Sequence, residues 1–223
     1  MSILAPEVLA NRLRIYARRR RAETLRARAM GKPFSAQAKE KLLLVTQAER
    51  IPQSQVFPFH HYAQDLMRLY DAEVREADVW QVLAGTPLLA CAASVVLFQT
   101  PFDIADADLF RLIERLRAEN PGAKIVYLDW FAPTDLRNAA RMDALIDFYI
   151  KKHVFRDRSI YGKPTRGDTN LTDFYNKRFG IDEPDQCFTV PNGFMDKLLV
   201  GPSFATAPGI MPTLLGSMPK VGD

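Results

Sequence analysis

Residues 124–131, KIVYLDWF, form an apolar run without the alternation of polar and apolar side chains that marks a half-exposed strand. Such a run is typical of a strand buried on both faces, as in a parallel sheet covered by helices. Comparable strands are predicted at residues 41–46, 94–100 and 146–154. Because helical segments separate them, this order predicts βαβ units and a Rossmann-like α/β domain with a mostly parallel sheet and flanking helices.

The segments between these strands have the spacing and composition of helices. In residues 106–120 the apolar side chains of Leu109, Leu112, Ile113 and Leu116 fall on one helical face. The stretch that begins at residue 47, QAERIPQSQVFPFHHYAQDL, contains two prolines and is predicted to be a long polar connection. Further helices are predicted at residues 62–70, 138–145 and 173–179, and a short strand followed by a helix is predicted at residues 72–76.

Positive charge is concentrated near the N-terminus. Residues 1–50 contain 12 basic and 4 acidic residues, whereas the rest of the chain contains 18 basic and 22 acidic residues. A helix is predicted at residues 6–30, and it includes Arg18, Arg19, Arg20 and Arg21. Such an arm either packs against the body as a solvated helix or contacts an anionic partner. An anionic membrane surface is favoured over nucleic acid, because no nucleic-acid-binding motif accompanies the arginines.

Composition divides the chain into three regions. Residues 1–36 are a basic helical arm, residues 37–200 the Rossmann-like α/β domain, and residues 201–223 a tail or linker rich in Pro and Gly. No apolar run approaches the roughly 20 residues of a membrane span, and the N-terminus lacks a secretory signal. Two cysteines far apart, Cys91 and Cys187, favour a reducing compartment. The expected location is the cytoplasm, with peripheral contact to the inner membrane face through the arm.

Several chemistries lack their motifs in this chain. It contains no P-loop, no GxGxxG turn after the first strand, no zinc-ligand spacing and no GxSxG elbow. Asp106 and Asp108 resemble the DxD pair that holds a divalent cation, but they open a predicted helix, where the macrodipole favours acidic residues. No metal and no resident cofactor is therefore expected.

Polar residues at the carboxyl ends of the predicted strands are the candidate site, because ligands of open α/β sheets bind there. Asp129 ends a buried strand, where it either acts as a base or caps the next turn. His60 and His61 are the other candidate bases, since imidazole titrates near neutrality, although a surface or structural role also explains them. The basic cluster after residue 150 suits a phosphate or an acidic sugar, and a salt-bridge network explains it as well. The candidate substrate-binding residues are Gln99, Asp135, Arg137, Lys152, Arg156, Arg158, Asp168 and Asn170.

The segments VVLFQT, AKIVYLDWFAPTDLR, IDFYIKKHVFRDRSIYG, GDTNLTDFY and VGPSFAT together resemble the N-terminal Rossmann half of bacterial GT-B-type glycosyltransferase-like proteins found with surface-polysaccharide genes. The resemblance covers residues 41–208. It implies two facing Rossmann domains in which the N-terminal half binds the acceptor and supplies a His or Asp base. The C-terminal half would grip a nucleotide-sugar, which is a co-substrate, and metal would not be needed.

The resemblance leads to two functional hypotheses. In the first, this chain is the acceptor-side domain of a glycosyltransferase-like protein that moves sugar from a nucleotide-sugar to an acceptor hydroxyl in surface-polysaccharide or glycan synthesis. The donor-binding half is then expected from a second α/β domain or a partner chain, since the sequence stops at Asp223. In the second, the chain is a non-catalytic binding or assembly module on a Rossmann-like scaffold, because no complete catalytic constellation is visible.

Overall fold

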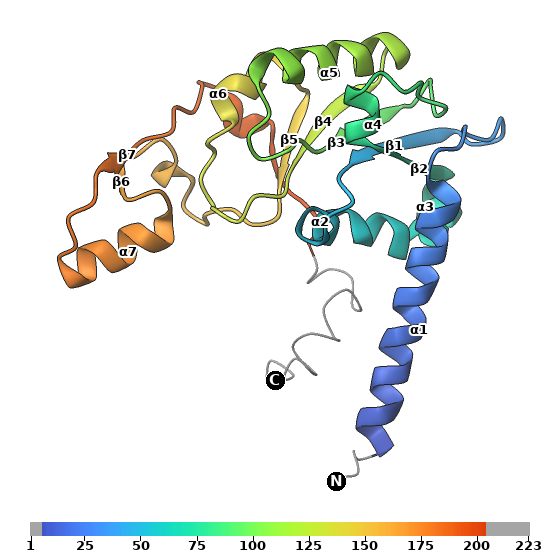
Figure 1. Cartoon of the computed structure of the whole chain (residues 1–223), viewed down its shortest axis with the longest axis horizontal. Coiled ribbons are helices and arrows are strands. Elements are labelled where there is room, and N and C mark those ends of the chain that lie inside the picture. The colour runs from blue at the N-terminus through green and yellow to red at the C-terminus, as the bar shows by residue number, and fades with distance from the viewer. Residues whose placement is uncertain (1–5, 204–223) are drawn as a thin grey trace.

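The computed structural model describes residues 6–203, and a six-stranded sheet forms its centre (Figure 1). Every strand pair in this sheet is parallel, and the spatial order is β2-β1-β3-β4-β5-β8. The Rossmann-like α/β fold predicted from the apolar runs is therefore confirmed. Most of the predicted tail, residues 204–223, lies outside the described part. The strands are β1 (Glu40–Thr46), β2 (Ala72–Asp78), β3 (Val95–Phe98), β4 (Lys124–Asp129), β5 (Phe148–Lys151) and β8 (Leu198–Val200).

Helices follow most of these strands, and several begin or end where the sequence predicts. Asp78 caps α4, because its side chain accepts hydrogen bonds from the backbone N–H groups of Trp80 and Gln81. Asn120 ends α5, where its side chain bonds to Leu116 O and to the N–H group of Ala93. The helices are α1 (Pro6–Ala29), α2 (Arg50–His61), α3 (Ala63–Tyr70), α4 (Val79–Leu83), α5 (Asp106–Glu119), α6 (Ala139–Met142) and α7 (Asn170–Phe179), with 3₁₀ turns at Asp143–Leu145, Arg158–Ile160 and Phe194–Asp196.

Alternate side chains of the strands pack into two apolar layers on opposite faces of the sheet. Leu43, Phe98 and Tyr127 belong to the layer that contains residues of α4, α5 and α6. Leu44 and Leu128 belong to the other layer, which contains residues of α2 and α3. Figure 1 shows α4, α5 and α6 above the sheet and α2 and α3 below it. Burial on both faces accounts for the continuous apolar runs in the sequence.

The predicted polar connection after β1 is wrong, because most of it forms the helix α2. Pro52 lies in the first turn of α2, where its missing N–H group costs no helical hydrogen bond. Pro58 lies inside the helix and does remove one such bond. Val56 is fully buried against the sheet, so packing on the apolar layer stabilises a helix that its prolines disfavour.

The predicted N-terminal helix is confirmed as α1, which projects away from the sheet for most of its length (Figure 1). Only Ala22 and Ala29 of α1 are buried, near the end where the helix meets α2 and β2. Leu9, Leu13 and Tyr16 are exposed. No helix within residues 6–203 is long and apolar enough to cross a membrane.

The chain between β5 and β8 leaves the sheet as a small lobe, shown in orange in Figure 1. A two-stranded antiparallel pair, β6 (Thr165–Arg166) and β7 (Asp185–Gln186), lies beside α7 in this lobe. Thr169 caps α7 through reciprocal hydrogen bonds with Thr172. Gly167 has a φ angle of +87°, and a Cβ atom there would lie 2.6 Å from Glu183 Oε2, so the turn requires glycine.

Candidate functional site

The topological switch point of the sheet lies between β1 and β3. β1 continues into α2 on one face, whereas β3 continues into α5 on the other, and ligands of doubly wound sheets bind outside such a point. Buried amides occupy this point: Gln99 Nε2 donates to Pro52 O at 3.0 Å, and Gln47 Nε2 donates to Thr100 O at 2.8 Å. Gln99 thus lies at the predicted edge of the sheet, but its side chain is hydrogen-bonded to the first turn of α2 and connects that helix to the sheet.

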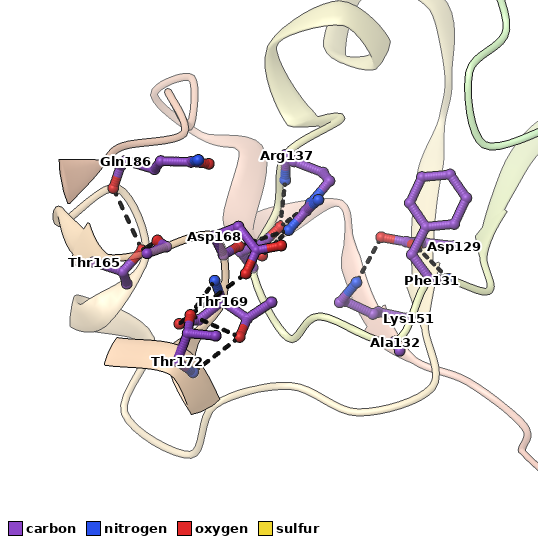
Figure 2. A network of polar contacts seen from close by, with 12 residues as sticks. Asp129, Phe131, Ala132, Arg137, Lys151, Thr165, Asp168, Thr169, Thr172 and Gln186 are labelled. Atoms are coloured by element: carbon purple, nitrogen blue, oxygen red, sulfur yellow. Dashed lines mark hydrogen bonds and ion pairs between the residues drawn. The ribbon is translucent and has the colours of Figure 1, made fainter. Parts of the chain in front are cut away.

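Asp129 lies at the carboxyl end of β4, as predicted, and is fully buried. Its Oδ2 atom accepts hydrogen bonds from Lys151 Nζ at 2.7 Å and from Tyr149 Oη at 2.5 Å. Its Oδ1 atom accepts from the Phe131 N–H group at 2.9 Å, and Figure 2 shows the bond to Lys151. Burial and then the Asp129 charge raise the pKa of Tyr149, which keeps the phenol protonated as a donor. The carboxylate therefore joins β4 to β5 and is not exposed to an incoming hydroxyl.

The two residues after β5 face this same edge of the sheet from more accessible positions. Lys152 is half-buried, and burial lowers the pKa of its ammonium group, although Asp129 opposes that shift. His153 is exposed, and its Nε2 atom lies 2.8 Å from Ala132 O in the loop after β4. A carbonyl oxygen can only accept, so Nε2 donates a proton to this bond, and in the tautomer with one ring proton Nδ1 is the acceptor. This geometry is that of an oriented general base.

Three of the predicted binding residues meet at the base of the lobe. Arg137 binds Asp135 in a bidentate ion pair, with Nε–Oδ1 and Nη2–Oδ2 distances of 2.9 and 2.8 Å. Its Nη2 atom also donates to Asp168 O at 2.9 Å, and the guanidinium carbon lies 4.9 Å from the centre of the Phe188 ring. Figure 2 shows Arg137 beside Asp168. Because the guanidinium is occupied by these partners, it holds the lobe to the domain rather than presenting a free fork to a ligand.

The other predicted binding residues of the segment after β5, which are Arg156, Arg158 and Asn170, belong to the lobe. Arg156, Arg158 and the side chain of Asp168 are exposed. Asn170 begins α7 and lines a cavity of about 30 Å³, together with Asp135. That volume suits about one water molecule. The lobe therefore offers exposed positive charge but no enclosed sugar-sized pocket at Asn170.

The two histidines of α2 lie apart from Asp129. His60 is buried, and its Nε2 atom lies 2.6 Å from Glu76 Oε2 in β2. Arg26 of α1 binds the same carboxylate with both Nε and Nη2. Burial raises the pKa of Glu76, but the hydrogen bonds from His60 and Arg26 outweigh it and lower the pKa to about 2.

His61, the next residue, points to different neighbours and lines a groove with Arg18 and Arg21. β1 and β3 separate β2 from β4 in the sheet, so neither α2 histidine joins Asp129 in one catalytic group.

His153 is the functional candidate that sequence reasoning missed. The signal in the sequence is its position directly after two lysines near the end of the strand predicted at residues 146–154. The neighbouring pair His60 and His61 attracted attention instead, although only the fold shows which histidine reaches the carboxyl edge.

Comparisons with protein families and with curated proteins give no match. Within residues 6–203, no group of three or more His, Cys, Asp or Glu side chains is arranged to hold a metal ion.

Proposed function

We propose that this chain is the acceptor-side domain of a GT-B-type glycosyltransferase-like protein, acting in the synthesis of a bacterial surface polysaccharide or glycan. One observation carries the proposal: His153 is exposed at the carboxyl edge of a parallel sheet and is oriented by Ala132 O, so that Nδ1 accepts a proton. The resemblance of residues 41–208 to such proteins, and the fold, support the same assignment.

The proposed reaction uses His153 in place of the bases first considered. The acceptor hydroxyl gives its proton to Nδ1 of His153 while its oxygen forms a bond to the anomeric carbon of a nucleotide-sugar. The bond from that carbon to the diphosphate breaks, and the nucleoside diphosphate leaves with the electron pair. Lys152, Arg156 and Arg158 lie in the same segment of chain, and their positive charge suits an acidic or phosphorylated acceptor. A second α/β domain or a partner chain would hold the donor.

The proposal includes peripheral association with the inner face of the cytoplasmic membrane. The helix α1 projects from the body and carries eight arginines against two glutamates. Each basic residue near an anionic leaflet contributes about 1 kcal/mol of attraction. Arg18, Arg19, Arg20 and Arg21 form the densest part of this charge.

A titration with a panel of neutral and acidic mono- and oligosaccharides tests the acceptor assignment. Binding should be followed through the NMR signals of the His153 ring in wild-type protein. We expect at least one saccharide to perturb these signals while leaving those of His60, which is buried against Glu76, unchanged. If no saccharide of the panel perturbs His153, the acceptor assignment is wrong.

A non-catalytic binding or assembly module is the second candidate function. It is favoured by the burial of Asp129 and His60, each of which is already paired with a charged or ionisable partner. Saccharide binding that survives His153→Gln, together with no transfer from UDP- or GDP-linked donors, would favour this second function.

A further inference from the structure

A groove with a volume of about 440 Å³ runs between α1 and the junction of α2 and α3. From α1 it is lined by Arg18 and Arg21, and from the junction by His61, Gln64 and Asp65. Arg21 donates to Gln64 Oε1 through Nη2, which fixes one guanidinium at the wall of the groove. Neither the sheet edge nor the lobe contributes to this lining.

The groove carries positive charge that its own residues do not neutralise. Within residues 6–203, neither Arg18 nor Arg21 forms an ion pair. Asp65 is the acidic residue of the lining, and it already pairs with Arg68 at 3.1 Å. The neighbouring Arg19 and Arg20 differ, because both lie within ion-pair distance of Glu23. An anion is therefore the ligand that this lining favours.

His61 responds to the same charge. Burial lowers the pKa of its imidazole, and Arg18 and Arg21 lower it further, while Asp65 raises it. The neutral ring that results has an N–H group available as a donor near pH 7. An anion bound between the two guanidinium groups would reverse part of this shift, so its binding can be read from the titration of His61.

We propose that this groove binds a phosphate group, held by Arg18 and Arg21 with His61 as a further donor. Planar guanidinium groups match phosphate oxygens in geometry and charge. The headgroup of an anionic phospholipid is the source that the surroundings favour. Leu9, Leu13 and Tyr16 are exposed on the N-terminal side of the groove, between about 3 and 14 Å along α1 from Arg18 at 1.5 Å per residue, and suit the boundary between headgroups and acyl chains. This choice of source rests on the proposed membrane association, whereas the phosphate site itself does not.

Inorganic phosphate titrated into the wild-type protein tests the site. We expect saturable shifts of the His61 ring signals and a higher pKa of His61 in the bound protein. The double variant Arg18→Gln/Arg21→Gln should bind phosphate at least about tenfold more weakly, because it loses two charge-assisted hydrogen bonds to the anion. The matched control Arg14→Gln/Arg20→Gln removes the same charge from exposed positions of α1 outside the groove and should retain the binding.

Three outcomes overturn the site. The first is that phosphate has no effect on the His61 signals of the wild-type protein. The second is that both double variants lose phosphate affinity equally, and the third is that neither loses any. The wild-type titration decides without any variant. Circular dichroism of both double variants should match that of the wild type, since the four side chains are exposed.

Sedimentation with vesicles identifies the source of the phosphate. Vesicles that contain phosphatidylglycerol should retain the wild-type protein more strongly than vesicles of phosphatidylcholine alone, and the groove variant should be retained less than the matched control. Phosphate binding at His61 without retention on phosphatidylglycerol would overturn the lipid source and the membrane association together. It would leave the sugar-transfer assignment, which is tested at His153, unaffected.

Discussion

The Lys151 ammonium and the Asp129 carboxylate form an ion pair 2.7 Å long between β5 and β4, and neither side chain is exposed to solvent. Two further donors, the Tyr149 hydroxyl and the Phe131 N–H group, complete the coordination of Asp129. A buried pair of this kind is stable only while both partners remain, because either charge alone is poorly solvated in the interior.

Replacing Lys151 by Met should therefore lower the free energy of unfolding by about 3–5 kcal/mol, since it leaves a buried carboxylate without its counter-charge. Urea denaturation at pH 7 measures the change. The matched control is Lys177→Met, which breaks the exposed pair with Asp173 and should cost about 1 kcal/mol or less. Equal effects of the two substitutions would contradict the structural role of Asp129.

The ion pairs around Glu76 predict a dependence of stability on acid pH. The pKa of Glu76 is about 2 in the folded protein, below its ordinary value of 4.5. The ionised Glu76 carboxylate therefore stabilises the folded protein fully above pH 4.5. This stabilisation is lost as the pH falls toward 2, because the unfolded state binds the proton at a higher pH than the folded state does. The contribution is about 3 kcal/mol. The free energy of unfolding, measured between pH 2 and 5, should fall more steeply with acid for the wild type than for Glu76→Gln. Parallel curves of free energy against pH would contradict the prediction.

The turn before α7 predicts a difference between two glycines. Gly167 and Gly180 both have positive φ angles, but only at Gly167 would a Cβ atom meet side chains, at 2.6–2.9 Å. Gly167→Ala should therefore destabilise the lobe more than Gly180→Ala, whose cost is about 1 kcal/mol from the backbone alone. Hydrogen exchange of the α7 amides is the measurement. Similar protection in the two variants would show that the turn tolerates a side chain.

The sheet could be predicted from the sequence because its strands are buried on both faces and therefore read as unbroken apolar runs. The helix α2 could not, because its prolines argue against a helix and its stabilisation comes from burial of Val56 and its neighbours. Local sequence does not contain the tertiary contact that decides such a case.

The site was predictable in position but not in detail. Asp129 was expected at the end of its strand and lies there, yet its partner Lys151 belongs to another strand, and only the register between β4 and β5 brings them together. His60 and His61 are adjacent in sequence, but the rotation of α2 directs the first toward Glu76 and the second toward Arg18 and Arg21. That rotation cannot be read from a pair of neighbouring histidines.

The most direct test of the proposed function is the rate of sugar transfer by His153→Gln compared with that of Lys177→Met, which changes an exposed residue of the lobe outside both proposed sites. The assay would supply UDP- and GDP-linked sugars, together with membranes of the source cells as the source of acceptor and of any partner chain. Loss of a general base lowers such a rate by about 100-fold or more. We predict a loss of that size for His153→Gln in every donor reaction that the wild type supports, and near wild-type rates for Lys177→Met. An undiminished rate for His153→Gln, or no transfer by the wild type from any donor, would contradict the assignment of this chain as the acceptor-side catalytic domain.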